Sequence, residues 1–227
     1  MKTEFAPRMN IKESNTKSPP TFLDTSGIAR TVVAFRKDEQ IYSQGDAAKS
    51  VMYIQKGNVK FSVVSASGKV AVVAMLGPSD FFGEGCMAGQ SVRTGTATAI
   101  TPTTVLAIDR EELLRMLRTQ DKLSDCFVWF MLSHKNRVEE ALIDQLFNSC
   151  EKRLARALLV LARYGKVQHQ PDDELPIVSQ ETLSEIIGTT RSRVNFFMRK
   201  FRKLGFIEIH NRKIQVNKSL LTFVLDE

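Results

Sequence analysis

Six basic residues stand between Arg191 and Lys203, with no acidic residue among them. Positive groups at this density repel one another unless a polyanion neutralises them, and nucleic acid is the commonest polyanion in a cell. The alternative is a helix with a merely solvated charged face. The six residues are Arg191, Arg193, Arg199, Lys200, Arg202 and Lys203.

The net charge is concentrated in the last third of the chain. The 227 residues carry a formal charge of +7. Residues 150–227 hold 14 basic and 9 acidic residues, whereas residues 21–149 hold 14 of each and residues 1–20 hold 4 and 2. A polyanionic partner is therefore expected at the C-terminal part of the molecule.

The residues before the basic segment have the order of a helix-turn-helix. Ser179 is placed to cap a short helix over residues 180–187. Gly188 follows, where the turn needs a backbone with positive φ. Either Thr189 or Thr190 then caps a second helix. The basic segment is thus expected on the second helix of the motif.

The second helix is expected to bury one side and expose the other. It ends at Gly205, and residues 206–216 alternate about a turn in the manner of a β-hairpin wing. Phe196 has two interpretations, as a contact for a thymine methyl group or as a spare core aromatic. The residues spaced for one buried stripe are Val194, Phe197, Phe201 and Leu204.

The exposed side carries groups that can read DNA. Arg191 can donate two hydrogen bonds to guanine O6 and N7 in a major groove, and Asn195 suits adenine or a phosphate. Arg199 and the lysines near it are expected at phosphates, where they set affinity rather than sequence. The residues expected at the DNA are Ser179, Thr189, Thr190, Arg191, Ser192, Arg193, Asn195 and Arg199.

The front half of the chain has the pattern of an all-β domain. Residues 31–108 are rich in Val, Ile, Thr and Phe and are broken by glycine turns. Residues 51–55 and 59–64 are predicted to form a hairpin about Gly57, and a second hairpin is predicted at Gly68. Short strands with regular turns favour an antiparallel jelly-roll barrel, so the fold class is α+β.

A long amphipathic helix is expected between the two halves, over about residues 122–147. Its apolar positions and one histidine have alternating three- and four-residue spacing. Such a helix has little to pack on except its own copy, which predicts a parallel homodimer seam. The alternative is a helix that lies on its own barrel. The proposed seam residues are Phe127, Met131, His134, Val138 and Ala141.

The chain is thereby divided into four parts. Residues 1–20 are expected to be a disordered tail, 21–121 the β-barrel, 122–148 the dimerisation helix and 149–227 the winged helix-turn-helix domain. No apolar run of about 18 residues is present, and the polar N-terminus is no signal peptide. A cytoplasmic protein without a membrane partner is expected.

Catalytic and metal-binding signatures are missing from the sequence. No Ser-His-Asp, metal-site or P-loop pattern occurs, so an enzyme is not expected. The three cysteines, Cys86, Cys126 and Cys150, are widely spaced and too few for a four-thiolate iron–sulfur cluster. The default for them is three free thiols in a reduced cytosol.

In this order, the elements resemble the Crp/Fnr family of bacterial transcription regulators over about residues 21–225. The resemblance implies a homodimer that binds an effector in the barrel, turns its DNA-reading helices at a palindromic site and recruits or blocks RNA polymerase. The pieces that carry it are the segments 41–46, Gly57, 81–84, Arg93-Thr94 and 187–191.

The resemblance also implies an effector site. In relatives that bind cyclic nucleotides, a Gly-Glu pair precedes an Arg-Ser or Arg-Thr pair. By that likeness Glu84 would accept from a ribose 2′-hydroxyl and Arg93 would pair with the cyclic phosphate of cyclic AMP or cyclic GMP. The effector-binding residues expected are Gly83, Glu84, Gly85, Cys86, Arg93 and Thr94.

Several residues depart from the family pattern. Gly85-Cys86 replaces an aliphatic and a small residue, and Gly95 stands where alanine is common. The positions that read adenine in relatives correspond here to Val138 and Glu139, which cannot do so in the same way. The phosphate–ribose half of a site is thus recognisable and the base-reading half is not.

Other interpretations of the barrel remain open at this stage. Glu84 and Arg93 could pair with each other in an effector-independent, structural barrel. Oxidation of Cys86 could block the site, although an inert buried thiol is the default. A haem is disfavoured because His134 lies on the long helix rather than in the barrel. A cyclic-nucleotide module without DNA binding is disfavoured by residues 179–216.

Overall fold

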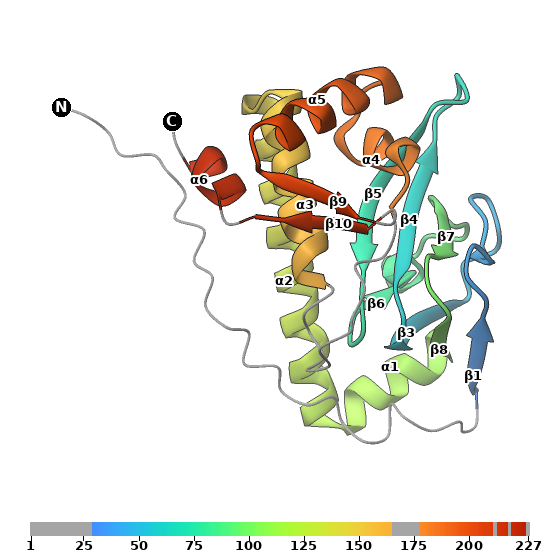
Figure 1. The fold of residues 1–227 in the computed structure, drawn as a ribbon. Helices are drawn as coiled ribbons and strands as arrows, with labels where there is room; N and C mark the ends of the chain where they lie inside the picture. Colours follow the sequence, from blue (N-terminus) through green and yellow to red (C-terminus); the bar gives the residue numbers. More distant parts are fainter. Residues whose placement is uncertain (1–28, 165–177, 211–212, 218, 226–227) are drawn as a thin grey trace.

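The computed structural model describes residues 29–164, 178–210, 213–217 and 219–225, so the predicted tail lies outside the described residues. The front half consists of two antiparallel four-stranded sheets (Figure 1). Their strand orders are β1-β8-β3-β6 and β2-β7-β4-β5. This arrangement confirms the jelly-roll class, although the two sheets do not join into a closed barrel. The strands are β1 (Arg30–Phe35), β2 (Gln40–Tyr42), β3 (Ser50–Lys56), β4 (Val59–Val64), β5 (Val70–Leu76), β6 (Phe81–Phe82), β7 (Thr96–Ala99) and β8 (Thr103–Asp109).

The hairpin predicted at Gly57 is wrong, because β3 and β4 lie in different sheets. β3 pairs with β8 and β6, whereas β4 pairs with β5 and β7. Gly57 has a φ of +90°, and a Cβ there would collide with the backbone of Pro102 and with Thr103. The chain therefore crosses between the sheets at a point where only glycine fits. The hairpin predicted at Gly68 is confirmed, since it joins β4 to β5.

The strand β3 supplies side chains to two separate apolar cores. Val51 and Tyr53 point to a core shared with the helices that follow the sheets. Met52 and Ile54 point instead to the core between the two sheets. Alternate residues of a strand face opposite sides, so one strand joins both cores.

Two helices follow the sheets. Asp109 stands at the N-cap position of α1 (Arg110–Thr119), but its side chain makes no capping hydrogen bond. The long helix α2 (Asp121–Phe147) covers residues close to those expected. None of the described helices is long and apolar enough to cross a membrane.

The face of α2 predicted as a dimer seam packs on the chain's own sheets. Phe127 makes an edge contact with Phe81 at 5.3 Å between ring centroids, and Met131 packs on the same core. His134 stacks on the buried Phe130 at 5.8 Å. The seam assignment was therefore wrong for these residues, because they belong to an intramolecular core.

The other face of α2 exposes apolar side chains among the described residues. We refer to its large apolar side chains as the α2 stripe, which is formed by Val128, Leu132, Leu142, Ile143 and Leu146. Val138 and Ala141 of the predicted seam are also exposed, but they continue the spacing of Met131 and His134 further along the helix than the residues of the core.

The second half consists of four described helices and a two-stranded wing, and its helix-turn-helix and wing are as predicted (Figure 1). A short break at Asn148, which is extended, separates α2 from α3. A C-terminal helix was not predicted, and its Leu220 and Val224 pack in the same core as Phe201. The elements are α3 (Cys150–Tyr164), α4 (Gln180–Ile187), α5 (Arg191–Lys203), β9 (Ile207–His210), β10 (Lys213–Val216) and α6 (Ser219–Leu225).

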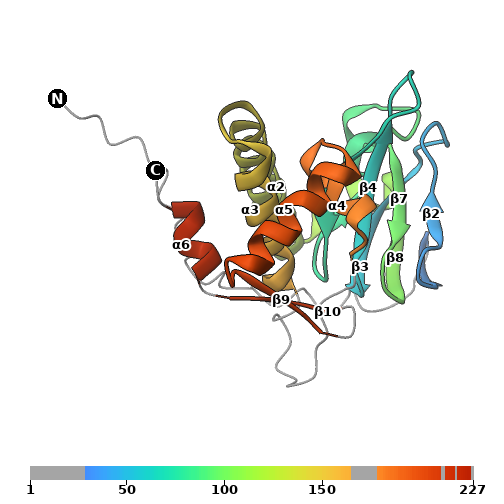
Figure 2. The same cartoon turned by 45° about the horizontal axis from the view of Figure 1, so that its top comes forward.

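The helix-turn-helix unit is docked on the second sheet, with α4 beside β4 and β5 (Figure 2). Met75 of β5 packs against the core of the helical unit. Lys60 of β4 places its Nζ 3.4 Å from Oε2 of Glu185 on α4. The two halves thus meet at a contact with one apolar and one ionic component.

Candidate functional site

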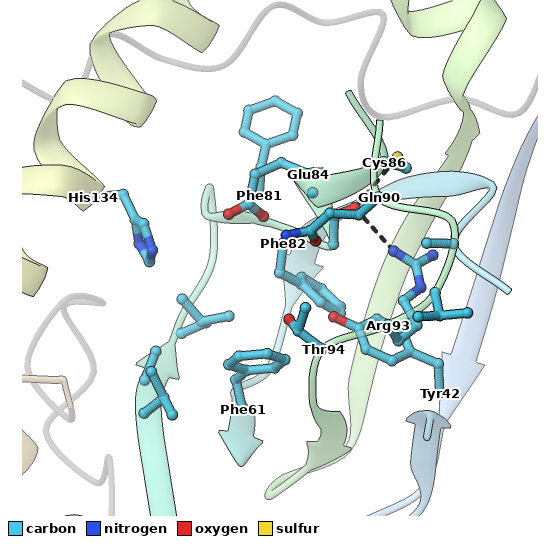
Figure 3. Close-up of a pocket in the computed structure, with 17 residues that line it drawn as sticks. Tyr42, Phe61, Phe81, Phe82, Glu84, Cys86, Gln90, Arg93, Thr94 and His134 are labelled. Atoms are coloured by element: carbon cyan, nitrogen blue, oxygen red, sulfur yellow. Dashed lines mark hydrogen bonds between the residues drawn. The ribbon is translucent and has the colours of Figure 1, made fainter. Parts of the chain in front are cut away.

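A cavity of about 200 Å³ lies between the second sheet, the turn after β6 and the long helix α2 (Figure 3). All six residues expected at the effector line it, namely Gly83, Glu84, Gly85, Cys86, Arg93 and Thr94. Strand β5 contributes Val73, Ala74 and Leu76 to the same lining. The cavity is thus built from segments that are distant in the sequence.

Arg93 is a buried cation that no carboxylate of the described residues pairs with. It is only 6% exposed. Its guanidinium donates to the carbonyl oxygen of Gly83 at 2.9 Å and to that of Ser50 at 2.7 Å, and it lies 4.3 Å above the ring of Tyr42. Its buried Nε has no hydrogen-bond partner among the described residues. A buried charge is costly unless an opposite charge compensates it, so this arrangement favours an anionic ligand.

Glu84 does not neutralise Arg93. Within the described part of the chain, no ion pair joins them, which removes the alternative of an internally paired site. Glu84 opens a 3-10 helix, η2 (Glu84–Ala88), and Gly83 before it has a φ of +76°. A Cβ at Gly83 would collide with the Arg93 guanidinium, which explains glycine at this position.

Gln90 and His134 are polar residues of the cavity that the sequence did not indicate as effector-binding. The side chain of Gln90 lies directly against the backbone of Gly85. His134 reaches the cavity from α2 on the side opposite Arg93 (Figure 3). Both side chains carry a donor and an acceptor. By contrast, Val138 and Glu139 do not line the cavity, and Glu139 is paired with Lys135 at 2.7 Å.

Two ionisable side chains of the cavity wall, Tyr42 and Cys86, favour their neutral forms. Burial raises the pKa of Tyr42 above its usual range, although Arg93 opposes this. Burial likewise raises the pKa of the Cys86 thiol, whose Sγ lies 3.4 Å from the Gly83 carbonyl oxygen. Since the thiolate is the reactive form, Cys86 has the properties of a packing residue.

The caps of the helix-turn-helix match the sequence pattern. Ser179 Oγ accepts from the backbone N–H of Thr182 at 3.0 Å. Gly188 is left-handed at the end of α4, and Thr190, not Thr189, caps α5 by accepting from Arg193 N–H. Side-chain caps of this kind hold the first turn of α5 in place.

The buried stripe of α5 differs from the predicted one. Val194 and Phe201 are buried, Phe197 is half-buried, and Met198 takes the fourth place. Leu204 is 51% exposed. Leu204 is the C-cap residue, one position past the last helical residue Lys203.

The opposite side of α5 is a row of exposed polar and basic side chains. Arg191, Ser192, Arg193 and Arg199 are exposed, and Asn195 is half-exposed. None of the arginines on α5 has an ionic partner among the described residues. Lys200 differs, because its Nζ lies 2.8 Å from Oε1 of Glu151 on α3.

Comparisons with known proteins match both halves. The description "Cyclic nucleotide-binding domain" covers residues 32–120, and "Crp-like helix-turn-helix domain" covers residues 152–219. The CRP-like cAMP-activated global transcriptional regulator of Mycobacterium tuberculosis is 25% identical over 188 residues, 82% of this chain and 84% of that protein. The global nitrogen regulator of a Nostoc species is 28% identical over 197 residues, 86% and 88% of the two chains.

A solved structure shows the same fold. The structure of FixK2 from Bradyrhizobium japonicum has a TM-score of 0.73 at 21% identity and covers 87% of this chain and 98% of that one. Together with the two domain matches, this fold defines a DNA-binding transcription regulator with a sensor domain of the cyclic-nucleotide-binding type. The chain belongs to the Crp/Fnr family.

Proposed function

We propose that this regulator binds a palindromic DNA site as a homodimer and that a small phosphate-bearing effector in the cavity controls its DNA affinity. The observation that carries the proposal is Arg93, a buried guanidinium in a cavity without a neutralising carboxylate among the described residues. A phosphate accepts hydrogen bonds from such a group and supplies the missing negative charge.

A cyclic nucleotide fits the remaining residues of the cavity. Glu84 supplies an acceptor for a ribose hydroxyl, and Thr94 supplies a hydroxyl beside Arg93. His134 and Gln90 are the polar groups available to a base. The names of the relatives include cAMP-activated regulators, so cyclic AMP is the compound to test first, with cyclic GMP as the second cyclic nucleotide.

A second candidate is a regulator whose sensor domain is purely structural. One observation favours it: the two terminal nitrogens of Arg93 already donate to protein oxygens, those of Gly83 and Ser50. In that case Arg93 would tie the turn after β6 to β3. The unpartnered Nε and the cavity beside it favour the effector-controlled regulator.

The α2 stripe supports the homodimer. Its large apolar side chains repeat along one side of a 27-residue helix, and the opposite side is already packed on the chain's own core. A contiguous apolar surface of this kind marks a protein–protein contact. A second copy of the same helix offers a matching surface, as in an isologous dimer.

Strand β5 offers a physical connection from the cavity to the DNA-binding unit. Its Val73, Ala74 and Leu76 line the cavity, while Met75 between them packs against the core of the helical unit. A ligand that displaces β5 would therefore disturb the contact with α4. Strand β5 is therefore a candidate for the element through which a ligand in the cavity changes the DNA-binding unit.

Selection of binding sites from a random pool of DNA duplexes tests the whole proposal. The expected product is an inverted repeat whose half-sites are about 10 base pairs apart, enriched more strongly with cyclic AMP or cyclic GMP present. An asymmetric single site would contradict the dimer. Equal enrichment with and without both nucleotides would contradict control by these effectors.

The ionic contact between the halves gives a second prediction. Lys60→Glu puts like charges at the contact with Glu185 and so weakens the docking of the helical unit on the second sheet. We expect this to free the helical unit for DNA and to raise DNA affinity in the absence of nucleotide about two- to fivefold. The double variant Lys60→Glu, Glu185→Lys restores the pair and should restore the wild-type affinity. Fluorescence anisotropy on the selected duplex measures both. A double variant that behaves like Lys60→Glu alone would contradict this function of the contact.

A further inference from the structure

Phe196 is an exposed aromatic residue in the middle of a basic helix face. Its side chain is 65% exposed, so it is not part of the core. It follows Ser192 by four residues and precedes Arg199 by three, and all three are exposed on the same side of α5. The sequence pattern allows Phe196 to be either a core aromatic or a DNA contact, and its exposure removes the first.

The ring of Phe196 is held at a defined place. It makes an edge-to-face contact with Phe197 at 5.5 Å between centroids. Phe197 packs against the core of the helical unit. An aromatic side chain with two rotatable bonds and one packed neighbour loses little entropy when it meets a partner. Phe196 is thus prepared for a contact outside the chain.

The charges around Phe196 define the partner. Three basic residues are near it in helical spacing: Arg193 three residues before, Arg199 three after and Lys203 seven after. None has an ionic partner among the described residues, so a second copy of this face would be repelled. The partner must be polyanionic and must also present an apolar point to the ring. In a DNA major groove that point is the C5-methyl group of thymine, which no other base presents.

We propose that Phe196 is a specificity-determining residue that recognises a thymine methyl group in each half-site. The proposal rests on the proposed function of α5 as the DNA-reading helix. Phe196 selects thymine over cytosine by burying one methyl group, whereas Arg191 selects guanine through hydrogen bonds. The two residues are five positions apart on α5, so they would read different base pairs.

Replacement of thymine by deoxyuridine tests this proposal, because it removes only the methyl group. Each thymine of the selected duplex is replaced symmetrically in both half-sites, and Kd is measured by fluorescence anisotropy. At one position we expect the affinity of the wild type to fall about fourfold per half-site, the value of one buried methyl group. Phe196→Ala should bind the thymine and deoxyuridine duplexes equally.

A matched control uses the other large exposed apolar residue at this helix. Leu204 lies just past the end of α5 and is 51% exposed, so Leu204→Ala should keep the full sensitivity to deoxyuridine. 5-Methylcytosine in place of cytosine at the sensitive position should restore part of the affinity that a thymine-to-cytosine change removes.

Three results would overturn the proposal. The first is wild-type protein that binds the selected duplex normally but is indifferent to deoxyuridine at every position. The second is a sensitive position that persists in Phe196→Ala. The third is tighter binding to the single strands than to the duplex, which would indicate stacking on bases instead. Failure to bind any duplex would overturn the function of α5 itself, a different result from the first.

Discussion

Arg93→Gln should lower the affinity for the cyclic nucleotide by at least about 100-fold, because the variant cannot make two charge-assisted hydrogen bonds to the phosphate and carries no positive charge. Glutamine keeps a hydrogen-bond donor and approximately the size of arginine, but it has no positive charge to pair with the phosphate. Isothermal titration calorimetry of wild type and variant with cyclic AMP and cyclic GMP measures the change.

The control for this variant must share its structural function. Arg110 also donates to the backbone of the turn after β6, through Nε to the Cys86 carbonyl oxygen at 2.9 Å, but it does not line the cavity. Arg110→Gln should therefore keep nucleotide affinity within about threefold of wild type, since it removes no group that touches the ligand. Thermal unfolding of both variants separates a defect in ligand binding from a defect in folding.

Two outcomes would contradict the effector site. If neither nucleotide binds the wild type at about 1 mM, the proposal of a cyclic-nucleotide effector fails and the structural sensor domain is favoured. If Arg110→Gln loses binding as completely as Arg93→Gln, the guanidinium of Arg93 acts by holding the turn rather than by contacting the ligand.

The parts of the molecule that the sequence predicts well are those set by local interactions. Ser179, Gly188 and Thr190 each specify a cap or a turn through their own backbone and side chain. The order of α4, α5 and the wing could therefore be read residue by residue. The same holds for the β4–β5 hairpin about Gly68.

The errors occur where a distant segment decides the outcome. A glycine turn between two strands, such as that at Gly57, has the same local pattern whether the strands pair or separate. Pairing of β3 with β8 rather than β4 depends on residues about 50 positions away. No local spacing contains that information.

The long helix shows the same limit on one element. Its apolar residues surround much of the helix, so spacing alone does not say which face meets the chain's own sheets. Phe127, Phe130 and His134 share a face, and the buried Phe81 fixes that face against the cavity. His134 could have been placed near the effector had that face been assigned to the intramolecular core.

Arg191 is the residue whose replacement should most change DNA specificity. It is exposed at the first turn of α5, which the Thr190 cap holds in place. We expect Arg191→Ala to cost about 1–3 kcal/mol and to relax the preference at one base pair in each half-site, because alanine cannot make the bidentate hydrogen bond to guanine. Site selection with the variant, followed by Kd measurements on single-base duplex variants, gives both quantities.

Arg199→Ala supplies the contrast, because it lies on the same exposed face two turns further along. Without the Arg199 guanidinium at a phosphate, the protein should bind all duplexes more weakly by a similar factor, and the salt dependence of log Kd should fall by about one unit. Arg191→Ala should change the ranking of bases at one position, whereas Arg199→Ala should leave every ranking as it is. Unchanged binding of Arg191→Ala to the selected site would reject Arg191 as a base reader. A uniform decrease in affinity over all sequences would move it to the phosphate-binding residues and leave Phe196 and Asn195 to select the bases.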